Sequence, residues 1–116
     1  MCAYAIGVLK GLLSSKDAER VLLYLQGRER GYGREIASFW RTAPTGVRRQ
    51  LERLEAAGAL SSAAIGRARV YAWNPRYPFA RELRALLARA IDLLPTDDRE
   101  RLILNRRRPR RAGKPL

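Results

Sequence analysis

The feature that most constrains the fold of this chain is a change of hydrophobic period near residue 59. Before it, the segment from Pro44 to Gly58 has apolar residues at helical spacing, and proline and glycine suit its first turn and its end. The residues that define its buried face are Val47, Leu51 and Leu54. After it, residues 60–73 read LSSAAI-GR-ARVYAW, which predicts two short strands joined at Gly66 and Arg67. The chain therefore passes from a helix straight into a hairpin.

Two more helical patterns precede this pair. SSKDAERVLLYLQG predicts a helix that Ser15 caps and that Gly27 follows. REIASFWRT, residues 34–42, predicts a helix of two to three turns with an apolar face. Only a few residues, around 41–43, separate this helix from the one that begins at Pro44, which is the spacing of a helix-turn-helix.

The helical period returns after the hairpin. Residues 79–94 carry an apolar stripe over four turns, and Pro95 ends it. Residues 95–105 predict a short helix capped by Thr96, whereas residues 106–116 have nothing to bury and are expected to be disordered. Residues 1–14 are apolar and predict a terminal helix. We therefore expect a mainly α-helical domain with a small β-hairpin, centred on residues 15–78 and followed by a long helix over 79–94.

The charge of the chain points to a polyanionic partner. The 116 residues include 24 basic and 11 acidic residues, a net charge of +13. Residues 106–116 contribute six basic residues, so the remainder still carries 18 − 11 = +7. Such self-repulsion is relieved by a nucleic acid, with an acidic membrane surface or an acidic protein as the other candidates.

Several classes of function are disfavoured by what the chain lacks. It has no histidine and one cysteine, Cys2, so it offers no ligand set for a metal and no imidazole for acid–base catalysis. It also has no phosphate-cradling glycine loop and no nucleophile elbow. The apolar start is too short to span a bilayer and lacks the basic residues that open a secretory signal. We expect a cytoplasmic protein that is not an enzyme and holds no cofactor or metal.

The segment GREIASFWRTAPTGVRRQLERLEAAGAL, with GRARVYAWNPRYP and FARELRALL after it, resembles winged helix-turn-helix regulators of the ArsR-like bacterial and archaeal type. In that pattern a GREIA-like helix precedes a recognition helix of the form TVRRxLxRLExAGLL, and the wing ends in Y-x-x-NP. The resemblance covers roughly residues 15–94. It implies a prokaryotic transcriptional regulator that binds double-stranded DNA and that we expect to be a repressor. The apolar surface of residues 1–14 and 79–94 exceeds what an isolated winged helix of this size needs, which predicts that the protein acts as a homodimer.

Two positions depart from the family pattern. Arg41 occupies the place of the usual glycine in the turn, so a left-handed backbone there would cost about 1 kcal/mol or more. Gly46 replaces the usual serine or threonine early in the recognition helix. It predicts a weaker helix, and room for a phosphate or a base edge to approach closely.

The buried stripe of the recognition helix predicts which of its side chains face DNA. Thr45, Arg49, Glu52 and Arg53 point away from it, and Arg48 lies on the flank. Arginine on such a face can bond guanine O6 and N7 in the major groove, whereas Thr45 suits a phosphate. The competing interpretation is an ordinary solvated face, in which Arg49 and Arg53 pair with Glu52 and Glu55.

Other predicted DNA contacts come from the wing and from the preceding helix. Arg67 at the wing tip is expected to reach the minor groove, with Arg69 beside it on a phosphate. Arg34 and Arg41 are candidates for further phosphates. A plain hairpin turn with a solvated arginine is the alternative for Arg67.

The dimer is expected to form through the long helix. Its predicted contacts are Phe79, Leu83, Leu86, Leu87, Ile91 and Leu94. The alternative function is a protein-interaction module, such as the antitoxin-like partner of a nucleotidyltransferase or toxin, that binds nucleic acid only loosely.

Overall fold

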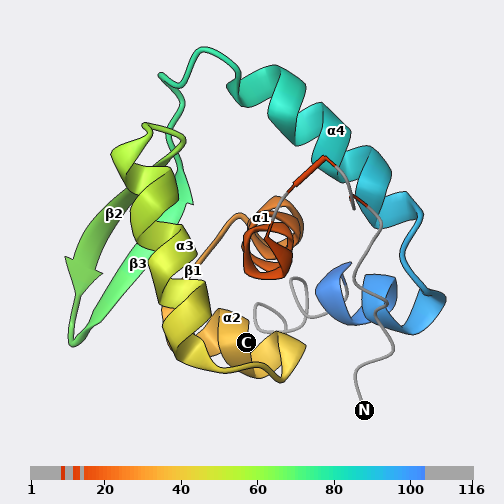
Figure 1. Ribbon diagram of the computed structural model, residues 1–116, viewed down its shortest axis with the longest axis horizontal. Helices are drawn as coiled ribbons and strands as arrows, with labels where there is room; N and C mark the ends of the chain where they lie inside the picture. Colours follow the sequence, from red (N-terminus) through yellow and green to blue (C-terminus); the bar gives the residue numbers. More distant parts are fainter. Residues whose placement is uncertain (1–8, 10–11, 14, 104–116) are drawn as a thin grey trace, which may run out of the picture.

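The computed structural model describes residues 9, 12–13 and 15–103 of the chain. These residues form five helices and one three-stranded antiparallel sheet. The elements are α1 (Lys16–Arg28), β1 (Arg30–Gly31), α2 (Gly33–Trp40), α3 (Pro44–Ala56), β2 (Leu60–Ile65), β3 (Ala68–Trp73), α4 (Ala80–Asp92) and a last helix over 96–103. Helix α1 lies in the centre, with α2 and α3 on one side, α4 on another, and the hairpin outside α3 (Figure 1).

Helix α1 is the element on which the others pack. The Ser15 hydroxyl accepts a hydrogen bond from the Ala18 amide at 3.2 Å, which confirms the predicted N-cap. The buried residues of α1 lie on all of its sides, as expected for a central helix: Ala18, Glu19, Val21, Leu22, Leu23, Tyr24, Leu25 and Gly27.

The predicted end of α1 was wrong. The helix continues through Gly27 to Arg28, and Glu29 takes the positive φ of 78°. Gly27 serves packing instead, because a β-carbon there would lie 2.5 Å from Cγ of the buried Leu102. The glycine therefore makes room for the last helix of the described chain.

Helices α2 and α3 follow the prediction closely. The apolar face of α2 is buried, and α3 begins at Pro44 and is followed by Gly58 with a φ of 92°. The turn between them contains Arg41 with φ 58° and ψ 48°, which is the left-handed conformation considered for that position. The Thr42 amide donates to the Ala37 carbonyl at 2.9 Å and closes the end of α2.

The hairpin forms as predicted, and the sheet gains one strand. Strands β2 and β3 pair from Leu60–Trp73 to Ile65–Ala68, with Gly66 at a φ of 62° in the turn. Strand β1 pairs with the other edge of β3, which gives the order β1-β3-β2. A two-residue strand has no periodicity of its own, so the sequence pattern did not reveal it.

Helix α4 and the last helix close the other side of α1. Leu87 and Ile91 of α4, with Leu94 just beyond it, are buried in the same core as α1. The last helix already includes residue 96, so Thr96 is not its cap, and the Arg99 amide donates to the Pro95 carbonyl at 3.0 Å.

Two arginines attach the last helix to α1 and α2. Arg101 donates to the Phe39 carbonyl at 2.7 Å, and its guanidinium lies 4.1 Å from the Phe39 ring centroid. Arg28 donates to the Leu102 carbonyl at 3.0 Å and stacks on Tyr24 and Phe39. One carbonyl in the last turn of α2, that of Phe39, is thus bonded by a residue more than 60 positions away.

Two expectations lie mainly outside the described residues. These are the helix predicted for residues 1–14 and the disorder predicted for residues 106–116. Leu9 is buried in the core, and its amide donates to the Glu19 carboxylate at 3.3 Å. No helix in the part of the chain that the structure describes is long and apolar enough to cross a membrane.

Candidate nucleic-acid interface

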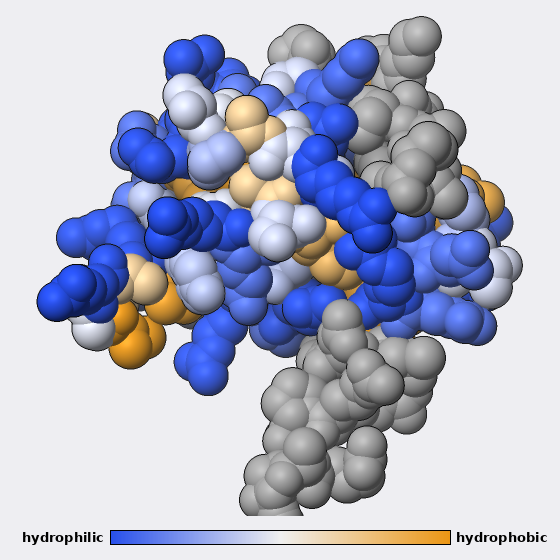
Figure 2. Space-filling view, turned by 90° about the horizontal axis from the view of Figure 1, so that it is seen from below, coloured by the Kyte–Doolittle hydropathy of each residue, from blue (hydrophilic) through white to orange (hydrophobic). Residues whose placement is uncertain are grey.

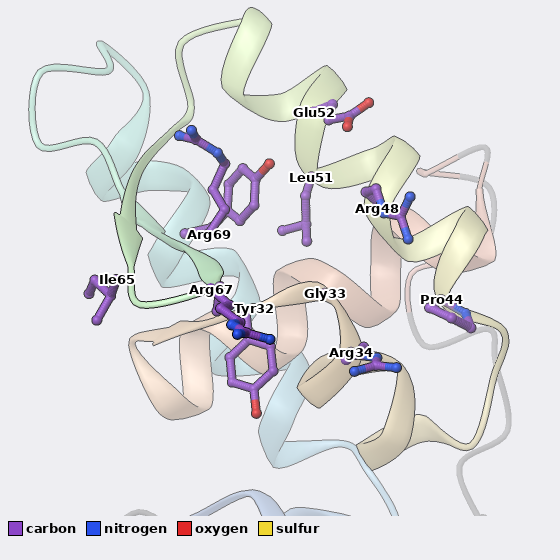
Figure 3. Close-up of a pocket in the computed structure, with 12 residues that line it drawn as sticks. Tyr32, Gly33, Arg34, Pro44, Arg48, Leu51, Glu52, Ile65, Arg67 and Arg69 are labelled. Carbon is purple, nitrogen blue, oxygen red and sulfur yellow. The ribbon is translucent and has the colours of Figure 1, made fainter.

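A groove of about 620 Å³ separates α3 from the hairpin. Its floor and walls come from the start of α2, one flank of α3 and the turn end of the hairpin (Figure 3). Four arginines from these three elements line it: Arg34, Arg48, Arg67 and Arg69. Glu52 is the one acidic residue among the lining residues. The groove therefore brings together positively charged side chains from distant parts of the sequence.

All four of these side chains are exposed. None of them belongs to an ion pair within residues 15–103. The ion pairs of this part of the chain involve other arginines: Arg20, Arg84, Arg89 and Arg101. Guanidinium groups that face an open groove without a carboxylate partner are free to bind phosphate oxygens or base edges.

A polar relay fixes the hairpin to α3. The Arg69 guanidinium donates to the Ser62 hydroxyl at 3.0 Å, and that hydroxyl donates to the Glu55 carboxylate at 2.7 Å. Tyr71 is buried at the back of the groove, and this burial raises its pKa, as do the nearby carboxylates of Glu55 and Glu52. Arg69 is thus oriented by the fold, whereas the Arg67 side chain at the tip forms no hydrogen bond with the part of the chain that the structure describes.

The residues of α3 that were predicted to contact DNA lie on two flanks of the helix. Arg48 lines the groove, whereas Thr45, Arg49 and Arg53 are exposed but are not among the residues that line it. Arg49 and Arg53 form no ion pair with Glu52 or Glu55 in the structure. Arg53 bonds Gln50 instead, at 3.1 Å. The ion pairs of the competing interpretation, between these arginines and Glu52 or Glu55, are therefore not formed.

The expectation that Gly46 leaves room for a phosphate or a base edge was wrong. A β-carbon at this position would clash with the carboxylate of Asp17, so the space beside Gly46 is occupied by the first turn of α1. Asp17 also accepts from Arg20 at 2.9 Å, and Arg20 donates to Thr42 at 3.1 Å in the turn before α3. The glycine lets α1 approach α3, and an anion already lies near the start of α3, where the helix dipole favours one.

Arg41 is exposed in the turn before α3 and is not among the residues that line the groove. The turn holds the backbone of Arg41 in the left-handed conformation. This conformation costs conformational free energy for an arginine, whereas a glycine would adopt it without that cost. Its predicted phosphate contact would lie beside α2 and α3 rather than in the groove.

Two exposed polar residues of the groove, Tyr32 and Glu52, were not among the predicted DNA contacts. Tyr32 precedes α2, is 39% exposed as a residue, and its amide donates to the Glu35 carboxylate at 3.4 Å. Glu52 lies on the predicted outward face, where the sequence suggested for it only an ion pair with Arg49 or Arg53. Charge and helical phase single out arginines, so they give no signal for a tyrosine in a glycine-rich turn.

The face that carries α2, α3 and the end of the hairpin is largely hydrophilic (Figure 2). A small hydrophobic spot lies toward its left edge, the side on which the hairpin turn lies in Figure 1. Ile65, 57% exposed, is the large apolar residue next to this turn. The surface therefore suits a charged partner along most of its length.

The predicted dimer contacts divide into two groups. Leu87, Ile91 and Leu94 are buried in the core of their own chain, and Leu83 packs against it, so these side chains do not offer a free surface. Phe79 and Leu86 are exposed, as is Leu93, which the predicted list omitted. The exposed apolar line of α4 is therefore Phe79, Leu86 and Leu93.

The described residues contain no group of three or more metal-binding side chains. Comparison of the chain with protein-family models, curated proteins and solved structures gave no match.

Proposed function

We propose that this protein is a winged helix-turn-helix regulator, of the ArsR-like type that its sequence resembles, that binds double-stranded DNA. The observation that carries the proposal is the groove in which four arginines from α2, α3 and the hairpin face solvent without ion-pair partners. Such an arrangement matches a duplex, whose two backbones flank a groove and present phosphates on both sides.

In the proposed complex α3 enters the major groove, and the hairpin lies along the adjacent backbone. Arg48, Arg49 and Arg53 are then within reach of base edges, with Thr45 and Arg34 on phosphates. Arg67 at the hairpin tip reaches the minor groove, where narrow A·T tracts attract arginine. Arg69, which the Ser62–Glu55 relay holds in place, contacts the backbone beside it.

Selection of double-stranded fragments from a random pool tests this function. We expect a recurring motif, and affinity for it that falls steeply with salt because bound arginines displace counterions. Single-stranded DNA of the same sequence is the control and should bind more weakly. Enrichment without any motif, with equal affinity for both forms, would contradict the proposal and favour loose binding by a protein-interaction module.

A homodimer is part of the proposal, formed through the outer face of α4. Phe79, Leu86 and Leu93 are exposed and spaced by seven residues, so they lie on nearly one line of the helix. An antiparallel second copy centred on Leu86 would place Phe79 against the partner's Leu93. Glu82 and Arg89 flank this line with opposite charges. The two-fold axis brings Glu82 of each copy close to Arg89 of the other copy.

Leu86→Glu is expected to convert the dimer to a monomer, because it puts two like charges together at the two-fold axis. Ala85→Glu, the same charge on the neighbouring exposed flank, is the matched control. Light scattering at several concentrations measures both. A wild-type protein that is monomeric with and without its DNA motif would exclude this interface.

A further inference from the structure

Glu52 is an exposed carboxylate in a surface that otherwise gathers arginines. It lines the groove together with Arg34, Arg48, Arg67 and Arg69. In Figure 3 its carboxylate points away from Arg67 and Arg69, toward open solvent. No ion pair or hydrogen bond within residues 15–103 involves its side chain.

The other carboxylates near the groove have partners inside the fold. Glu55 accepts from Ser62 and so fixes the hairpin, and Glu35 accepts from the Tyr32 amide at the start of α2. Glu52 has no comparable structural bond. Arg48 lies four residues before it, the order in which a helical ion pair is less favourable.

A carboxylate in this place opposes phosphate binding. It repels the backbone that the arginines attract, so it weakens binding to DNA in general. A residue of this kind raises specificity if it gains a donor from the correct sequence and repels the wrong one.

We infer that Glu52 is a base-reading residue, which accepts a hydrogen bond from the exocyclic amino group of cytosine in the major groove. The inference rests on the proposed function. A carboxylate offers only acceptors, and the cytosine edge presents an N4 donor with no acceptor beside it. The O4 of thymine and the O6 and N7 of guanine are acceptors, which a carboxylate repels.

The test is selection of bound double-stranded DNA by the full chain and by Glu52→Ala and Glu52→Gln. The wild type is expected to require cytosine at one position of each half-site. Glu52→Ala should discriminate cytosine from the other bases at that position about 5- to 150-fold less than the wild type does. It should also bind unrelated DNA more tightly, because the repelling carboxylate is gone. Glu52→Gln should shift the preference toward adenine, whose N6 and N7 a glutamine amide can bond together.

Glu100→Ala is the matched control, since it removes the same charge from the exposed side of the last helix. It should leave the motif unchanged. A wild-type motif that both Glu52 variants retain, at every position and with the same discrimination, would overturn this inference and leave the proposed function intact. The absence of any motif for the wild type would overturn both. Thermal unfolding of the Glu52 variants, expected to match the wild type, verifies that they fold.

Discussion

Replacing Arg34 and Arg48 together with alanine is expected to lower the affinity for double-stranded DNA by roughly 30- to 1000-fold. Each substitution removes one charge-assisted contact to DNA, and the loss of two such contacts weakens the binding free energy by about 2 to 4 kcal/mol. Both residues line the groove without an ion-pair partner, so their removal leaves no unpaired carboxylate behind. The slope of log affinity against log salt should become shallower by about one, because Arg34 contacts a phosphate in the proposed complex whereas Arg48 reaches base edges.

The matched control is the pair Arg76→Ala and Arg81→Ala. These two exposed arginines lie after β3 and on α4, away from the groove, and their removal changes the net charge equally. Fluorescence anisotropy across a salt series compares the two double variants. Equal losses of affinity would show that binding follows net charge alone, and would argue against the groove as the DNA site.

The core of the fold could be predicted because it depends on local periodicity. Val47 and Leu51 fix the buried side of α3, and the residues around Gly66 mark the hairpin turn. Both are signals within one element, and the structure confirms them. The helix-to-hairpin order then restricts how the sheet can lie beside α3.

What the sequence could not predict depends on contacts between distant segments. Gly27 looks like a helix end, but it is a packing site for Leu102, 75 residues later. Gly46 looks like an opening toward a ligand, but Asp17 of α1 occupies the space. A glycine has the same local signature in each role, and only the tertiary neighbour distinguishes them.

The candidate site was predicted by composition more than by geometry. Helical phase placed Arg49 and Arg53 at the centre of the outer face, with Arg48 at its edge. The groove instead joins Arg48 to Arg34 and Arg67, because the hairpin covers that flank of α3. The angle between a helix and a hairpin is set by packing, through contacts such as Ser62 with Glu55, and has no one-dimensional signal.

Leu102→Ala is expected to destabilise the protein by about 2 to 4 kcal/mol, a large part of the stability of a small domain. Leu102 is fully buried, and its side chain fills the space that Gly27 leaves open on α1. Truncation would leave a cavity between α1 and the last helix. It would also loosen the packing of the last helix, from which Arg101 donates to the Phe39 carbonyl at the end of α2. Chemical denaturation measures the free energy of unfolding, and the midpoint temperature should fall by roughly 10 °C or more.

Ile103→Ala is the control, since this neighbour in the same helix is 37% exposed and should cost about 1 kcal/mol or less. Gly27→Ala tests the same contact from the other side. In the wild type the added methyl group collides with Leu102, whereas in Leu102→Ala it refills part of the cavity. The double variant should therefore be more stable than the sum of the two single changes predicts. Additive effects, or equal costs for Leu102→Ala and Ile103→Ala, would mean that the last helix does not pack on Gly27.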